Sequence, residues 1–159
     1  MTKQEFKEFC QIECVKRGFK KKKNMYYLAG SEVLCGIALQ KSSYGPCYYV
    51  EYDFFIGKYE APSHYPTSYE ADIYRRIAVL SKDTVDGQHF MDALIEYEKY
   101  DISEIKPYFE QAFDEYILPP VLEGVSVFLE KKAHYFKAVF PEDYDNVMGK
   151  IQKIQSGNS

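Results

Sequence analysis

The chain has 159 residues, of which 46% are hydrophobic and 28% charged, a composition typical of a soluble globular domain. It excludes a disordered, collagen-like or wholly coiled-coil protein. No apolar run approaches the roughly 18 residues needed to span a bilayer, and the polar start at Met1–Glu5 lacks the apolar segment of a secretory signal. We therefore expect a cytoplasmic protein with one domain over residues 1–155 and a disordered tail at 156–159.

Charge is distributed unevenly along the chain, although the net charge is only −4. Residues 1–50 hold nine basic and four acidic side chains, whereas residues 51–100 hold five basic and ten acidic ones. An acidic chain gains nothing from releasing the counterions of a polyphosphate, so a nucleic-acid partner is not expected. A basic partner would be attracted to the later two-thirds of the chain.

The helix and strand signals begin with Thr2 and Glu5, whose spacing matches a capping box that opens a helix over Lys3–Arg17. A short aromatic strand follows at 25–28, then a strand at 33–40 and a hairpin loop at 42–46. The clearest strand covers 47–56, where strict alternation places Val50 and Tyr52 on one face and Glu51 and Asp53 on the other.

The second half of the chain is predicted to turn from strands to helices. The stretch 57–71 is expected to be a long irregular loop, 72–81 a strand and 82–87 a connection. Residues 89–97 fit a strand or a helix, and we favour a strand. Helical periodicity spans 108–117 and breaks at Pro119 and Pro120, after which one helix should bury Val121, Leu122, Val125, Phe128 and Leu129, and another follows Pro141.

This order predicts an α+β fold. It should have an N-terminal helix, a mostly antiparallel sheet of about four to five strands, and a helical C-terminal third packed on one sheet face. The covered face is the one that carries Val33, Ile37, Val50 and Tyr52.

Several short motifs resemble an uncharacterised bacterial family, domain of unknown function 4304. The motifs are Gly18-Phe19-Lys20-Lys21-Lys22, Leu39-Gln40-Lys41-Ser42, Tyr48-Tyr49-Val50, Arg75-Arg76-Ile77 and Ile117-Leu118-Pro119. The resemblance covers roughly residues 2–130 and implies no established activity, cofactor or catalytic residue. Small bacterial families of this kind are similar to immunity or accessory proteins of toxin systems, which is a fold-level analogy.

The cysteines and histidines do not form a recognisable reactive site. Cys10 and Cys14 lie one helical turn apart without further ligands nearby, and nothing places Cys47 beside His64. His89 and His134 are expected to be surface or capping residues. A chain of this size needs no disulfide framework, so we expect free thiols and no metal or cofactor.

The candidate binding residues lie on one strand face and in the loop that follows it. Glu51 and Asp53, about 7 Å apart on one strand face, should be exposed beside Gln40. Tyr49 would add an aromatic anchor on the same face, and the loop would add Tyr59, Tyr65 and Tyr69.

The sequence thus favours a non-enzymatic domain that binds an unidentified protein partner, a basic one above all. An immunity-type inhibitor of a bacterial toxin would be one such protein. Two other hypotheses stay open: a small hydrolase or transferase with an unrecognised site, and a structural protein that self-associates through its aromatic surface. The oligomeric state does not follow from the sequence, and no membrane partner is expected.

Overall fold

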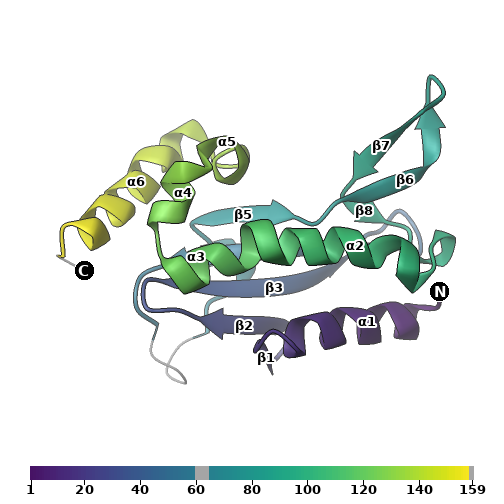
Figure 1. The fold of residues 1–159 in the computed structure, drawn as a ribbon, viewed down its shortest axis with the longest axis horizontal. Helices are drawn as coiled ribbons and strands as arrows, with labels where there is room; N and C mark the ends of the chain where they lie inside the picture. Colours follow the sequence, from purple (N-terminus) through teal and green to yellow (C-terminus); the bar gives the residue numbers. More distant parts are fainter. Residues whose placement is uncertain (60–64, 158–159) are drawn as a thin grey trace.

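The computed structural model describes residues 1–59 and 65–157 and places helices against an antiparallel sheet (Figure 1). Helix α1 (Lys3–Val15) begins with the predicted capping box, in which Thr2 Oγ1 accepts from the Glu5 amide and the Glu5 carboxylate accepts from the Thr2 amide. It ends just before Gly18, whose φ of 95° is the left-handed conformation that terminates many helices. Its apolar stripe is buried against the rest of the protein: Phe6, Phe9, Cys10 and Cys14.

Six strands of the described residues form the main sheet, which confirms the predicted α+β class. In spatial order they begin with β1 (Lys20–Lys22), β2 (Met25–Ala29), β3 (Val33–Lys41), β4 (Tyr48–Ile56) and β5 (Ile73–Arg76). The short strand β8 (Leu94–Ile95) pairs with the first residues of β4, and all pairs are antiparallel. Strand β4 is therefore hydrogen-bonded on both edges.

The strand predicted for 72–81 is wrong in extent, because the chain leaves the main sheet at Ile77. Strand β6 (Val79–Val85) then pairs with β7 (Gln88–Asp92) in a separate hairpin that projects from the molecule (Figure 1). The predicted connection at 82–87 is thus mostly strand, and the turn is only Asp86-Gly87, both with positive φ. The favoured strand at 89–97 is confirmed in type, but it is divided between β7 and β8, which belong to different sheets, and Tyr97 begins a 3₁₀ turn. Most of this hairpin is exposed, so its sequence lacks the alternation that burial produces.

The C-terminal third is helical, as predicted, but it is more divided. It contains α2 (Ile102–Ala112), a π-helical turn (Phe113–Ile117), α3 (Leu118–Glu123), α4 (Ser126–Glu130), α5 (Lys132–Tyr135) and α6 (Pro141–Gln155). The helix predicted after Pro120 is split at Gly124, which has a φ of 100°, and Leu122 is exposed rather than buried. The Glu32 carboxylate fills the space beside Gly124 and accepts from the Val125 amide. The predicted tail includes residues 158 and 159, which lie outside the described residues.

The π-helical turn is tied to the start and end of α5 by two carbonyl groups whose α-helical donor positions, four residues on, are prolines. Pro119 and Pro120 stand four residues after Glu115 and Tyr116 and have no N–H to donate to them. The Glu115 carbonyl instead accepts from Lys131 Nζ at 3.0 Å, and the Tyr116 carbonyl accepts from the Tyr135 hydroxyl at 2.8 Å. The helix break therefore exposes carbonyl groups to which Lys131 and Tyr135 bind, and these hydrogen bonds hold α5 against the π-helical turn.

Both faces of the sheet carry buried side chains. We call the side of Val50 and Tyr52 the near face, which belongs to the large core under the helices, and the side of Glu51 and Asp53 the far face. A smaller cluster lies on the far face and consists of Met25, Tyr27, Leu34, Ala38 and Phe55. The four cysteines are buried and free. No helix within the described ranges has both the length and the apolar character to cross a membrane.

Replacing Tyr135 by Phe should destabilise the protein by about 1–2 kcal/mol, because it removes the donor to a part-buried carbonyl whose α-helical partner position is a proline. Chemical denaturation would measure the free energy of unfolding. Tyr108→Phe is the matched control, since its hydroxyl makes no hydrogen bond within the described part of the chain. Equal stability of the two variants would contradict this role for Tyr135.

Candidate functional site

The expected exposure of Glu51 and Asp53 is wrong, because both side chains are buried. Glu51 retains 5% of its accessible surface and Asp53 none. Their alternation with Val50 and Tyr52 is as predicted, but the far face is not open to solvent at this point. The sequence pattern distinguishes the two faces of a strand and does not show that a distant segment covers the polar one.

The cover comes from strand β2 and from the chain between β4 and β5. The ring of Tyr65 lies 5.0 Å from that of Tyr27, and the ring of Tyr59 lies 6.1 Å from that of Phe55. A Cβ atom at Gly36 would lie 2.8 Å from Met25 Cε, so the glycine allows this close approach. Tyr59 and Tyr65 are thus packing residues rather than free contact residues. The predicted loop includes residues 60–64, which are outside the described residues.

A groove of about 640 Å³ runs along the remaining part of the far face. Gln40 and Glu51 line it together with residues at the start of β2 and in β3, and further lining comes from three other segments. Tyr74 and Arg76 project from β5, Tyr69 from the 3₁₀ turn η1 (Ser68–Glu70), and Phe140 and Asp143 lie at the start of α6. Tyr69 is fully exposed, so of the three loop tyrosines only this one presents its whole side chain.

A polar network joins three of the predicted site residues to one that the sequence analysis missed. Gln40 Nε2 donates to Glu51 Oε2 at 3.3 Å, and Arg76 Nη2 donates to Gln40 Oε1 at 3.3 Å. Arg76 Nε also lies 3.8 Å from Glu51 Oε1, while its guanidinium stacks 3.9 Å above the ring of Tyr49. Gln40, Tyr49 and Glu51 therefore do form one surface, and Arg76 organises it.

Asp53 lies beneath this surface with neither carboxyl oxygen hydrogen-bonded within the described residues. Burial raises its pKa from 3.8 to about 9, and the neighbouring Glu51 carboxylate adds to the rise. Asp53 is consequently protonated at neutral pH. It is next to the groove, because Glu51 and Ser68, the groups that act on its pKa, both line it.

A pair of neighbouring carboxyl groups such as Glu51 and Asp53 is a common arrangement for general acid–base catalysis. Here, however, Asp53 is completely covered, and a substrate in the groove would reach Glu51 alone. Glu51 is in turn engaged by Gln40 and Arg76. The arrangement is thus suited to binding a positive charge and poorly suited to transferring a proton to a bound molecule.

The residues that the sequence analysis missed come from elements distant along the chain. Tyr74 and Arg76 alternate on β5, and register places Arg76 opposite Glu51 and Tyr74 opposite Asp53. This alternation is visible in the sequence, but the pairing with β4 is not. Phe140 and Asp143 reach the groove only because α6 returns to the sheet, for which the sequence carries no signal.

The other candidate groups do not form a site. Within the described ranges, no group of three or more His, Cys, Asp or Glu side chains is placed to hold a metal ion. Cys47 is buried with its thiol directed at the Gly45 carbonyl, and His64 is outside the described residues. His134 is not the surface or capping residue that was expected, since it stacks 3.7 Å from the ring of Tyr116 on the near face.

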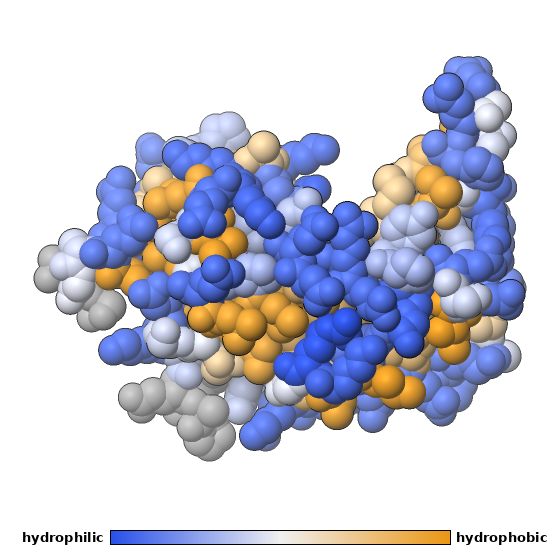
Figure 2. Space-filling model, viewed as in Figure 1, coloured by the Kyte–Doolittle hydropathy of each residue, from blue (hydrophilic) through white to orange (hydrophobic). Residues whose placement is uncertain are grey.

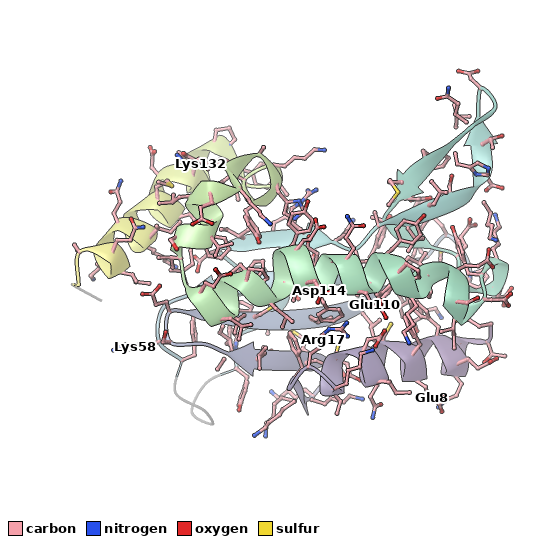
Figure 3. The ribbon with its side chains drawn as sticks, viewed as in Figure 1. Glu8, Arg17, Lys58, Glu110, Asp114 and Lys132 are labelled. Atoms are coloured by element: carbon pink, nitrogen blue, oxygen red, sulfur yellow. The ribbon has the colours of Figure 1, made fainter. Side chains whose placement is uncertain are left out.

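Asp53→Asn should remove a pH dependence of stability. In the wild type the folded state keeps the Asp53 proton up to a pKa of about 9, whereas the unfolded state loses it near 3.8. Stability should therefore fall as pH rises from 5 to 8, by up to about 1.4 kcal/mol per pH unit, and the variant should lack this fall. Asp114→Asn, at an exposed position labelled in Figure 3, is the control. Parallel pH profiles for wild type and Asp53→Asn would show that Asp53 is ionised in the folded protein.

Comparison with known proteins identifies the family and no activity. No curated protein and no solved structure gives a significant match to the chain. The family described as a domain of unknown function, DUF4304, matches residues 15–154. This match covers nearly all of the sheet and the C-terminal helices, and it agrees with the resemblance in the sequence motifs. The chain therefore belongs to the DUF4304 family.

Proposed function

We propose that this protein is a binding domain whose far-face groove takes a basic segment of a partner protein. The observation that carries the proposal is the Glu51–Asp53 carboxyl pair beside the groove. Glu51 has a cation 3.8 Å away, at longer than hydrogen-bond distance, and Asp53 has no hydrogen-bond partner within the described residues. A lysine or arginine side chain seated in the groove would give Glu51 a second cation at hydrogen-bond distance, whereas Asp53 beneath it is protonated and carries no charge.

The charge around the groove favours a basic partner over an acidic one. Glu51 and Asp143 contribute negative charge to the lining, against the single positive charge of Arg76 among the described lining residues. Complementary charge speeds the encounter of two proteins and excludes acidic competitors. The same surface already shows how a cation would be held, since Arg76 lies flat on Tyr49 while it faces Glu51.

Contact area would come from the groove rim. Tyr69 is fully exposed and Phe140 keeps 59% of its surface, and both line the groove. Exposed aromatic side chains beside a charged centre are typical anchors of protein interfaces. Tyr59 and Tyr65 support this rim by packing against the far-face cluster and are not proposed as contacts.

The proposal includes an immunity-type inhibitor as one form of the function. Such an inhibitor would act by occupying a basic surface of a toxin, which requires an acidic and aromatic contact surface of this kind. It rests on analogy with other small bacterial families. A gene for a large secreted toxin next to the gene for this protein would favour this form over other protein partners.

Binding can be tested by an NMR titration with two peptides of equal length, one rich in Lys and Arg and one rich in Glu. The basic peptide should shift resonances of groove residues, and Glu51→Gln should weaken its affinity by about tenfold, the usual contribution of one charged hydrogen bond. Asp114→Asn is again the control because Asp114 is exposed and does not line the groove.

Three results would refute the proposed function. They are shifts that are scattered over the surface, equal shifts with the acidic peptide, and an affinity that Glu51→Gln leaves unchanged. A reversal of both carboxylates to Lys is not a usable test, because it would bury two ammonium groups and unfold the protein.

A further inference from the structure

A second polar cluster lies on the opposite side of strand β4 from the groove. Its centre is the pair Tyr52 and His134, whose hydroxyl oxygen and Nε2 are 2.8 Å apart. Tyr52 is 1% exposed and His134 is half-buried. The imidazole is held from its other side by Tyr116, whose ring stacks on it at 3.7 Å with an interplanar angle of 13°. The orientation of His134 is thus set by contacts on two sides.

Positive charge surrounds this pair. Arg75 is the partner of Tyr52 in the β4–β5 ladder, and Lys131 Nζ lies 5.1 Å from the centre of the Tyr116 ring. Burial lowers the pKa of His134 from 6.5 to about 4, and the charges of Arg75, Lys131 and Lys137 lower it further. Arg75 and Lys131 are placed close to the neutral imidazole by these contacts, and the charge of Lys137 also reaches it.

These cations have no negative partner in the described part of the protein. Arg75 and Lys137 make no ion pair there, and Lys131 donates to a carbonyl rather than to a carboxylate. Arg75 Nε is buried without a hydrogen-bond partner. A half-buried guanidinium without a counter-charge is costly to the fold, which is expected where a ligand supplies the anion.

The lysines of this cluster are open to solvent, whereas Tyr52 is buried. Strand β5 runs between α5 and the base of the β6–β7 hairpin (Figure 1). Figure 2 shows the molecule hollowed between the C-terminal helices and the hairpin, with hydrophilic side chains on the floor of the hollow. Lys131 and Lys137 are exposed, so a small molecule can reach them without opening the core.

We propose that Arg75, Lys131, Lys137 and the Tyr52–His134 pair form a binding site for the phosphate group of a small molecule. An arginine fork and flexible lysine ammonium groups suit the tetrahedral oxygens of phosphate. Three positive charges match a dianionic phosphate better than a singly charged carboxylate. The neutral imidazole offers its second ring nitrogen as an additional polar contact. The site is independent of the far-face groove, because Tyr52 and Glu51 project from opposite faces of β4.

The test is an NMR titration that follows the His134 imidazole resonance. Inorganic phosphate and glycerol 3-phosphate should both shift it with saturation, whereas acetate should bind at least severalfold more weakly. A preference for one of the two phosphates identifies free phosphate or a phosphate ester as the ligand. Potassium chloride at equal ionic strength corrects for screening.

Two exposed lysines of the same helical region provide matched variants that leave the core intact. Lys137→Gln should weaken phosphate binding by about tenfold, whereas Lys132→Gln should not, because Lys132 is not among the cations that act on His134. Arg75→Gln should abolish saturation.

The proposal is overturned if chloride reproduces the shift of the His134 resonance, if no shift saturates, or if Lys132→Gln weakens binding as much as Lys137→Gln. None of these results depends on whether the groove binds a basic segment.

Discussion

The burial of strand β4 on both faces is the constraint on which the rest of the structure depends. Hydrogen bonds to β3 on one edge and to β5 and β8 on the other place it inside the sheet. Its near-face side chains Tyr52 and Phe54 enter the main core, and its far-face side chain Phe55 enters the second cluster. Polar groups on this strand are thereby removed from water, and each one must find a protein partner or change its protonation state.

Asp53 and Tyr52 show the two outcomes on adjacent residues. Asp53 has no hydrogen-bond partner in the described structure, so it keeps its proton at neutral pH. Tyr52 finds His134, and the hydrogen bond links the centre of the sheet to the C-terminal helices. The candidate groove and the candidate anion site therefore lie on opposite faces of the same strand. The groove has an excess of negative charge, and the anion site has an excess of positive charge.

The proline pair acts on the candidate anion site through the C-terminal helices. Because Pro119 and Pro120 donate no amide hydrogens, the preceding carbonyls recruit Lys131 and Tyr135 and hold α5 against the π-helical turn. This docking brings His134 onto Tyr116. The start of α6, the next helix after α5, contributes Phe140 and Asp143 to the groove. The missing proline amides are thus replaced by hydrogen bonds from Lys131 and Tyr135, which join two separate helical segments.

Local sequence signals determined the elements of this protein and the division of each strand into two faces. The capping box of α1 is correct because its hydrogen bonds join residues three positions apart, and the alternation over 47–56 is correct because the pleat has a period of two. Gln40, Tyr49 and Glu51 could be grouped for the same reason. The sequence did not reveal that Asp53 is buried, that Arg76 faces Glu51, or that His134 meets Tyr52. Each depends on residues brought together from distant parts of the chain, and only the tertiary structure decides which segment covers a face and with what charge.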